Sequence, residues 1–484
     1  MNLSNSYRNL DSRFFEQATP VAVSGPELFL WNDDLASLLG IDKENDFSNA
    51  EEVAQLFSGN RIAADSSPVA LVYAGHQFGQ FNPQLGDGRA HLLGEIEDRN
   101  GKTRDMQLKG SGPTSFSRGG DGRCAIGPAV REFLMSEAMH ALGVPTSRCL
   151  SVVTTGESVY RESVMPGAIV CRVAASHLRV GSFQFFAARQ DTEALQALRD
   201  FAIEKHCPQY LQEPNKSELL LQWVIEKQIS LLIEWMRVGF IHGVLNTDNT
   251  SISGETIDYG PCAMMGVYDP KTVYSSIDHG GRYAYGNQPN IIHWNLARFV
   301  ECILPLAGKA DSSTVENIEN MIAEVPDGIN EKYSAMMANK FGLRKLGPGD
   351  GKLMTSLLQI FLSQKLDYTN TFDLLTRSLD SDDARDKAEV ILGDQYSLWR
   401  QRLDEQDVSI EQGQSLMRQN NPLLIPRNHH VEAAIKECEE NLDPSAVVKM
   451  LEALRSPYEE TEFTSLYQDL PEDGDSQYKT FCGT

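Results

Sequence analysis

The spacing of hydrophobic and polar positions changes along the chain near residue 217. Between residues 68 and 180, short apolar or β-branched runs alternate with glycine-rich turns, a pattern typical of strands. These runs are Val69–Ala74, His91–Ile96, Asp105–Leu108, Cys149–Thr154 and Ala168–Val173. Among them, Val130–Leu142 has apolar residues at helical spacing and is followed by Gly143 and Pro145, which predicts one embedded helix.

The second part of the chain predicts helices. Leu219–Val238 is apolar on most of its turns, which predicts a largely buried helix that stops at Gly239. Further helices are predicted at residues 290–305, 313–324, 328–341, 351–365, 383–405 and 430–454. We expect the acidic, polar tail from Pro457 to be extended. The pattern therefore predicts an α+β protein with a β-rich first part and a larger helical second part.

Composition and charge exclude several classes of function. The 484 residues include 43 Lys and Arg against 67 Asp and Glu, a formal net charge of −24. This charge argues against nucleic acid as a partner, because nucleic-acid binding needs a basic surface. It also argues against an anionic membrane surface. We expect no signal peptide and no transmembrane helix, since no basic stretch precedes an apolar run and no run of about 18 apolar residues occurs.

Eight cysteines are scattered along the chain without any Cys-x-x-Cys pair. A zinc site or a disulfide framework is therefore not expected, and we predict a reducing, cytoplasmic compartment.

The segment that follows the buried helix carries a pattern of protein kinases. Kinases have His-Arg-Asp-x-x-x-x-Asn and then Asp-Phe-Gly. Here His242 and Asn249 have the matching spacing, and Asp258-Tyr-Gly260 follows nine residues later. Asn and Asp supply the hard oxygen ligands that Mg²⁺ prefers while it bridges phosphates. We predict that Asn249 and Asp258 bind a metal; the alternative is that Asn246, Asp248 and Asn249 only shape a polar turn.

One position departs from the kinase pattern. Val244 stands where kinases have the catalytic aspartate, and a valine cannot accept a proton or orient a hydroxyl. Asp248 is the nearest carboxylate that could replace it.

Lys109 and Glu132 match a second kinase pattern. Lys109 ends a predicted strand and Glu132 lies on the helix that follows, as do the kinase Lys and Glu that pair beside the ATP phosphates. Two unrelated surface charges are the alternative for any one such pair. The order Lys, Glu, His-x₆-Asn, Asp-x-Gly favours a kinase-like, two-lobed fold.

Glycine-rich segments flank Lys109 on both sides. Leu85–Arg89 and Gly119–Arg123 both contain Gly-Asp-Gly-Arg. Glycines let backbone N–H groups approach phosphate oxygens, and arginine offers a planar fork for the same oxygens. Since Gly-Asp-Gly is also a common turn, Asp87 and Asp121 could instead be turn-forming residues.

Two arginines, Arg172 and Arg179, bracket a segment that contains Ser176 and His177, and this arrangement suits a phosphate clamp. Solvent-facing arginines are the alternative. No nucleophile lies at motif spacing from His177, His76 or His242, so we interpret these histidines as residues that orient loops.

Taken together, these segments resemble the selenoprotein O family (SelO or YdiU in bacteria). The resemblance extends from about Tyr7 to the C-terminal cysteine. It rests on Val72–Gly79, Gln84–Ala90, Leu108–Thr114, Arg131–Met139, Gly239–Asn249, Thr256–Pro261 and the motifs between Gly281 and Leu296. It implies a pseudokinase fold. Residues 1–165 would form an N-terminal extension and β-rich N-lobe, and residues 166–484 a mainly helical C-lobe with a C-terminal tail.

The resemblance also implies an activity. The protein would bind ATP in an orientation reversed relative to kinases and transfer AMP to Ser, Thr or Tyr hydroxyls of proteins, with release of pyrophosphate. It would need Mg²⁺, and UMP transfer with Mn²⁺ is a further activity that the resemblance implies. We expect a monomer whose partners are ATP and proteins that bear such hydroxyls.

Site residues follow from the resemblance position by position. Lys109 and Glu132 would form the ion pair, Asn249 and Asp258 would bind the metal, and Asp248 would accept the proton. The residues that contact the nucleotide would be Gly86, Gly88, Arg89, Lys109, Asp121, Gly122, Arg172, Arg179 and Asp258.

Cys482 matches a position that is selenocysteine in some members of the family. In some bacterial members this cysteine pairs with one in the loop after the Asp-Tyr-Gly motif. Here Cys262 is the only cysteine in that loop, so a redox pair of Cys262 and Cys482 is a hypothesis, and an inert free thiol is the alternative.

Two other functions remain open from the sequence. Ordinary phosphoryl transfer is one, and Val244 argues against it. A non-catalytic ATP-binding scaffold is the other, and the presence of two metal ligands, Asn249 and Asp258, argues against it.

Overall fold

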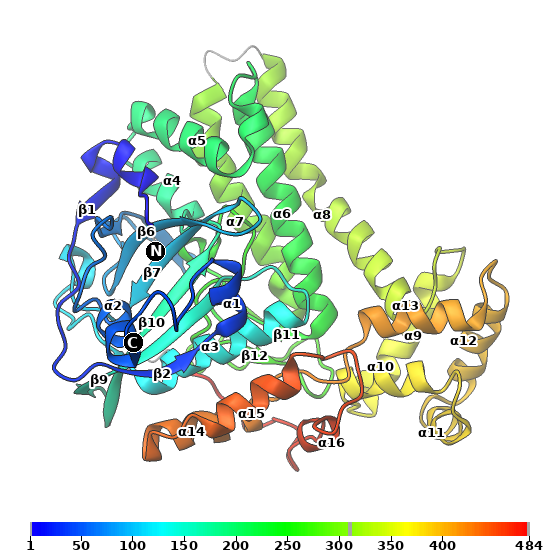
Figure 1. Cartoon of the computed structure of the whole chain (residues 1–484). Helices are drawn as coiled ribbons and strands as arrows, with labels where there is room; N and C mark the ends of the chain where they lie inside the picture. Colours follow the sequence, from blue (N-terminus) through cyan, green and yellow to red (C-terminus); the bar gives the residue numbers. More distant parts are fainter. Residues whose placement is uncertain (1, 308–311, 482–484) are drawn as a thin grey trace.

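A large antiparallel sheet occupies the first part of the protein (Figure 1). The structure is a computed structural model that describes residues 2–307 and 312–481. Eight strands form the sheet in the order β1-β3-β6-β7-β10-β9-β2, with β8 paired to β10. Their bounds are β1 (Phe15–Gln17), β2 (Glu27–Trp31), β3 (Val69–Leu71), β6 (Ala90–Glu97), β7 (Thr103–Lys109), β8 (Cys124–Ala125), β9 (Arg148–Tyr160) and β10 (Val164–Ala174). The five predicted strands are confirmed in β3, β6, β7, β9 and β10. The short edge strands β1 and β2 were not predicted, because runs of three to five residues carry little periodicity.

The central strands bury both faces, which explains their continuous apolar runs. Val152 and Val170 belong to the core that includes α3 (Ile126–Ala141). Val153 and Ile169 point to the opposite face and belong to a second core. That core is covered by α1 (Asp33–Leu38) and α2 (Ala50–Phe57). Successive residues of each strand thus enter different cores, so alternation of polar and apolar positions is absent.

Helices make up most of the second part. Helix α6 (Lys216–Val238) is largely buried, and it ends at Gly239 in the left-handed region (φ +78°), as predicted. Around it pack α5 (Thr192–His206), α7 (Gln288–Ile303) and α8 (Ser312–Lys340), while α4 (Val180–Ala187) packs on α7.

The remaining helices form two further groups. An arm projects to one side in Figure 1 and consists of α9 (Asp350–Ser363), α10 (Tyr368–Arg377), α11 (Asp382–Leu392), α12 (Asp394–Asp404) and α13 (Ile410–Asn420). The chain then returns to the sheet, where α14 (Asn428–Asn441) and α15 (Ser445–Leu454) pack on α3, and α16 (Thr464–Tyr467) follows in the tail. The tail is therefore not wholly extended.

Four predicted helices have different ends in the structure. The helix predicted at 383–405 breaks at Gly393 (φ +54°), and the one at 430–454 breaks at Leu442 (φ +51°) and Pro444. The two helices predicted at 313–324 and 328–341 are one helix, α8, which contains Pro326 in its interior. Proline removes one backbone hydrogen bond, but packing of α8 on both α6 and α7 sustains the helix through it.

Two small two-stranded sheets border the segment that carries the kinase-like motifs. The β4 (Gly75–Gln77) and β5 (Gln80–Asn82) strands form one, and β11 (Phe240–Ile241) pairs with β12 (Ala263–Met264) in the other. The division predicted after residue 165 stays a prediction, and β10 crosses that position.

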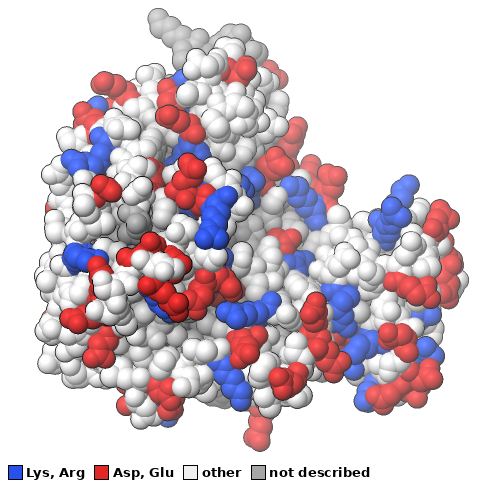
Figure 2. Space-filling model, viewed as in Figure 1, with Lys and Arg blue, Asp and Glu red and all other residues white. Residues whose placement is uncertain are grey.

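Acidic and basic side chains are interspersed on the face shown in Figure 2. The negative charge of the chain is thus spread over this face. Among the described helices, none combines the length and the apolar character that crossing a bilayer requires.

Burial of both strand faces predicts a matched set of stability changes. Ile169 and Val170 are adjacent, fully buried and in different cores, so Ile169→Ala should lower the free energy of unfolding by about 2–5 kcal/mol and Val170→Ala by about 1–3 kcal/mol. Val164 is the control, because it starts the same strand and is 62% exposed. Val164→Ala should change the free energy of unfolding by less than about 0.5 kcal/mol. Urea unfolding measures all three, and a neutral effect at either buried position would contradict two-sided burial.

Candidate active site

Register between β7 and β10 places two cations on one face of the sheet. Lys109 pairs with Val170, and Gln107 pairs with Arg172. Directly paired residues of an antiparallel ladder share a face, and so do residues two apart. Lys109 and Arg172 therefore point to the side where α3 packs.

Two carboxylates lie between these cations. Lys109 Nζ donates to Glu132 Oε2 and to Asp258 Oδ1, each at 2.7 Å. Arg172 Nη1 donates to Glu132 Oε1 at 3.1 Å and to Asp258 Oδ1 at 2.9 Å. The structure thus brings the predicted Lys109–Glu132 pair together and extends it to Asp258, which is 149 residues from Lys109 in the sequence.

Arg179 adds a third cation from the turn before α4. Its Nη1 donates to Asp258 Oδ2 at 3.3 Å and to the backbone oxygen of Asp248 at 2.8 Å. Its Nη2 lies 3.8 Å from Asp87 Oδ1, and its guanidinium lies over the ring of Tyr73. Arg179 therefore links the two carboxylate-bearing segments 248–249 and 258–260.

The three neighbouring cations keep the Asp258 carboxylate deprotonated. Burial alone would raise its pKa, but Lys109, Arg172 and Arg179 outweigh this and hold the pKa well below its ordinary value. Asp258 also has φ +60°, in the left-handed region that a non-glycine residue seldom adopts. Its neighbours Ile257 and Tyr259 are buried, and His242 Nε2 lies 3.0 Å from the backbone oxygen of Ile257. His242 orients this loop, as we predicted.

Asp248 has a different environment. Its side chain is 7% exposed, Oδ2 accepts a hydrogen bond from Gln77 Nε2 at 3.1 Å, and Oδ1 has no hydrogen-bond partner among the described residues. Burial raises the pKa of Asp248 to about 6. A carboxyl group with this pKa can accept and release a proton near neutral pH.

The β4–β5 hairpin lies directly against the Asp248 segment. His76 N donates to Thr247 Oγ1 at 2.7 Å, and Phe78 N donates to Asn246 Oδ1 at 3.1 Å. A Cβ on Gly75 would lie 2.5 Å from Asp248 Oδ1, so only glycine permits this approach. The sequence did not predict that Gly75 and Gln77 contact Asp248, because about 170 residues separate the two segments and only the folded chain brings them together.

The donor set suits a divalent cation. Asn249 Nδ2 donates to the backbone oxygen of Val244 at 2.9 Å, which leaves the amide oxygen of Asn249 available for another partner. The unpartnered Asp248 Oδ1 and the half-buried Asp258 carboxylate supply further hard oxygens. Oxygen ligands of this kind are those that Mg²⁺ binds.

The glycine-rich loops fold against their own neighbours. A Cβ on Gly86 would lie 2.4 Å from Phe116 Cγ, and one on Gly88 would lie 2.8 Å from the backbone oxygen of Phe116. A Cβ on Gly122 would lie 2.1 Å from the backbone carbon of Gly112. These glycines thus permit close packing between the loops that flank Lys109.

Two predicted loop residues differ in their contacts. Asp121 is bound by Arg161 Nη1 and Nη2, each at 2.9 Å, and is not joined to the Lys109 network. The side chain of Arg89, which is half-buried, makes no hydrogen bond or ion pair with any described residue. Its guanidinium is therefore available to an anionic ligand.

One cysteine of the predicted redox pair, Cys262, lies in the buried loop after Asp258. Cys262 is buried, its thiol donates to the backbone oxygen of Tyr259 at 3.2 Å, and burial raises its pKa to about 12. Cys482 lies outside the described residues. Thr480, two residues earlier, donates from Oγ1 to the backbone oxygen of Pro261 at 2.7 Å. The tail therefore approaches the Cys262 loop, and the redox pair stays a prediction.

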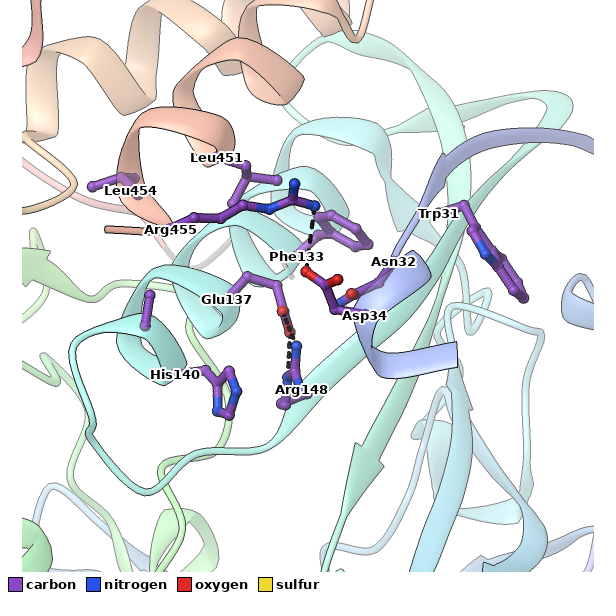
Figure 3. Close-up of a pocket in the computed structure, with 11 residues that line it drawn as sticks. Trp31, Asn32, Asp34, Phe133, Glu137, His140, Arg148, Leu451, Leu454 and Arg455 are labelled. Atoms are coloured by element: carbon purple, nitrogen blue, oxygen red, sulfur yellow. Dashed lines mark hydrogen bonds and ion pairs between the residues drawn. The ribbon is translucent and has the colours of Figure 1, made fainter. Parts of the chain in front are cut away.

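A cavity of about 430 Å³ lies on another side of α3 (Figure 3). It is bounded by α3, α15 and the β2–α1 connection, and no predicted site residue lines it. Across it, Arg148 Nε donates to Glu137 Oε1 at 2.9 Å, which fastens α3 to β9. This contact supports the helix that carries Glu132.

Comparisons with known proteins give matches over almost the whole chain. The profile of a family described as "Protein adenylyltransferase SelO" matches residues 1–455. A "Protein nucleotidyltransferase YdiU" of Teredinibacter turnerae is 52% identical over the whole of both chains. Proteins of the same description from Anoxybacillus flavithermus and Methylorubrum populi are 49% and 47% identical, and the matches cover 98% or more of each chain.

The environment of Asp248 predicts a pH-dependent gain in stability from Asp248→Asn. Because the folded-state pKa is raised to about 6, folding opposes ionisation, so this group lowers stability as pH rises from about 4 to 6. Asp248→Asn should raise the free energy of unfolding by up to about 3 kcal/mol above pH 6, and by little below pH 4. Denaturant unfolding of both proteins at pH 4, 5, 6 and 7 measures this difference. A gain that does not change with pH would contradict the assignment.

Proposed function

This chain belongs to the protein adenylyltransferase SelO family and is a nucleotidyltransferase, and from that premise we propose that it transfers AMP from ATP to Ser, Thr or Tyr hydroxyls of other proteins. One observation carries the proposal. Three buried cations, Lys109, Arg172 and Arg179, converge on the Asp258 carboxylate beside a buried carboxyl group, Asp248, whose pKa is near 6.

We propose a two-lobed, kinase-like fold for this activity. The eight-stranded sheet with Lys109 and α3 would be the N-lobe, and the helices around α6 would be the C-lobe. The ion pair between Lys109 and Glu132 supports this, since kinases pair a strand lysine with a helix glutamate of the N-lobe beside the ATP phosphates.

The cations would bind the phosphates of ATP. The carboxylates of Glu132, Asp258 and Asp87 face the three positive charges of Lys109, Arg172 and Arg179, so an anionic ligand would bind by taking over part of these contacts together with its own divalent cation. Triphosphate oxygens would replace part of the contacts to Asp258, and Arg89 would add a further phosphate contact. Fixed cations of this kind stabilise charge that develops on the phosphate oxygens in the transition state.

Asn249 and Asp258 would hold Mg²⁺, or Mn²⁺ if UMP is transferred. A bound divalent ion supplies neutralisation of the triphosphate charge and orientation of its oxygens. The residues then perform the remaining tasks: Glu132 holds Lys109, and Arg179 holds Asp258 against the backbone of Asp248.

Asp248 would be the proton acceptor. The acceptor hydroxyl gives its proton to the Asp248 carboxylate as its oxygen forms a bond to the α-phosphorus. The bond between the α-phosphorus and the bridging oxygen breaks, and pyrophosphate leaves with that electron pair. The proton then passes from Asp248 to water. A group with a pKa near 6 suits this cycle at neutral pH.

The partners in this proposal are ATP and proteins with accessible hydroxyls, and the enzyme would act as a cytoplasmic monomer. Ordinary phosphoryl transfer is disfavoured because Val244, whose backbone oxygen accepts from Asn249, offers no carboxylate. A non-catalytic scaffold would not explain why Oδ1 of Asp248 is buried without a hydrogen-bond partner among the described residues.

A labelling experiment tests the proposal. With Mg²⁺ and a generic acceptor protein, label from α-³²P ATP should be transferred and label from γ-³²P ATP should not. Lys109→Ala and Asp258→Ala should each abolish transfer, and Asp248→Asn should lower the rate about 10²–10⁴-fold through loss of the base. Label from γ-³²P ATP alone would indicate a kinase, and no label from either would indicate a scaffold.

The close contact between Gly75 and Asp248 predicts a second loss of transfer activity. Gly75→Ala would place a methyl group 2.5 Å from Asp248 Oδ1, so it should displace this carboxyl and lower the rate of AMP transfer at least about 10-fold. Gly280→Ala is the matched control, because no atom lies within 4 Å of the added Cβ and its rate should not change. Rates under saturating ATP, with melting temperatures as a check on folding, measure both. Equal rates for the two variants would argue against Asp248 as the proton acceptor.

A further inference from the structure

Two histidines and one aspartate meet away from the site described above. His429 and His430 lie in the first turn of α14, and Asp469 follows α16 in the tail. None of these residues contacts the Lys109 network. The tail therefore brings a carboxylate back to the start of a helix that lies about 40 residues earlier in the chain.

Both imidazoles direct a nitrogen at the same carboxylate. His430 Nε2 lies 2.7 Å from Asp469 Oδ1, and His429 Nε2 lies 3.4 Å from Asp469 Oδ2. The two rings are 4.0 Å apart between centroids. One ligand atom from each residue lies within 4.8 Å of the others, the compactness that a single metal ion requires.

His429 has unused binding capacity. Neither of its ring nitrogens has a hydrogen-bond partner among the described residues, although both atoms are shielded from solvent. A buried polar atom without a partner costs about 1–3 kcal/mol. A cation on the lone pair of Nε2 would remove part of this cost.

We propose that His429, His430 and Asp469 bind one Zn²⁺ ion. Two imidazoles and a carboxylate are common ligands of this ion, and a tetrahedral site would leave the fourth position to water, since all three residues are partly exposed. Bonds of about 2.0–2.2 Å place tetrahedral ligand atoms about 3.3 Å apart. The 3.4 Å separation already fits, and the 2.7 Å separation needs to open by about half an ångström.

The ion would fasten the tail to α14. Near the same helix end, Asn428 Nδ2 donates to Asp475 Oδ2 at 3.0 Å and to the backbone oxygen of Met264 at 2.8 Å. One turn later, Glu432 accepts from Arg131 of α3 and from Tyr478 of the tail. Zn²⁺ would thus add a cross-link at the point where the tail leaves α16, on a helix that packs against α3.

Zn²⁺ titration of the full-length, metal-stripped protein in excess Mg²⁺ tests the proposal. The unmodified protein should bind one equivalent by calorimetry, and His429→Ala and Asp469→Asn should each weaken binding at least about 100-fold. His279→Ala is the matched control: His279 is an exposed histidine outside the cluster, so this variant should bind like the unmodified protein. Asp258→Ala should also retain the site, which separates it from the proposed catalytic metal.

A second measurement needs no substitution at the cluster. Co²⁺ bound to the unmodified protein should give the intense visible absorption of tetrahedral coordination, and Zn²⁺ should displace it. Zn²⁺ should also slow proteolytic removal of the tail. No saturable binding, weak six-coordinate Co²⁺ bands, or affinity unchanged in both cluster variants would overturn the proposal and leave Asp469 as an ion-pair partner of the histidines only.

Discussion

The carboxylate of Asp258 is the point on which the rest of the site depends. It joins Lys109 of β7, Arg172 of β10 and Arg179 before α4, so one side chain ties the sheet to the loops of the helical part. Three buried cations this close together repel one another, and charges removed from water are tolerated only when they are paired. The left-handed conformation of Asp258 is sustained because these three partners and its buried neighbours outweigh the backbone strain.

Two carboxyl groups in this region have their pKa values pushed in opposite directions. Burial raises that of Asp248, which has Gln77 and no cation on its carboxylate oxygens, whereas the pKa of Asp258 is held low by three cations. With these different environments, Asp248 suits the role of a proton acceptor and Asp258 that of a ligand that stays negatively charged. The backbone oxygen of Asp248 and the carboxylate of Asp258 share Arg179, which joins the two segments directly.

The position of Glu132 depends on contacts beyond the sheet. Helix α3 is held to β9 by Glu137 and Arg148. Arg131, the residue before Glu132 on this helix, contacts Glu432 of α14 and Tyr478 of the tail. The tail then reaches the loop after Asp258, where Thr480 contacts Pro261. The C-terminal segment thus contacts both the helix that carries Glu132 and the loop that follows Asp258, and a metal on His429, His430 and Asp469 would stabilise this arrangement.

The sequence by itself determined the strands that carry Lys109 and Arg172, the buried helix α6, and the order of the motifs, because local periodicity, glycine stops and motif spacing are properties of neighbouring residues. It could not determine that Pro326 stays inside one helix or that Gly393 and Leu442 break others, since packing between helices decides those ends. Kinase-like motif spacing and the resemblance named Asp248 and Asp258, yet the raised pKa of one and the lowered pKa of the other come only from burial and from cations brought together across the fold. Gly75 and Gln77 lie in one of the segments that carry the resemblance, but their contacts with Asp248 had no signal in the sequence, and Asp469 had none either. Their contacts join segments that are 40 to 170 residues apart, and only the tertiary structure brings such segments together.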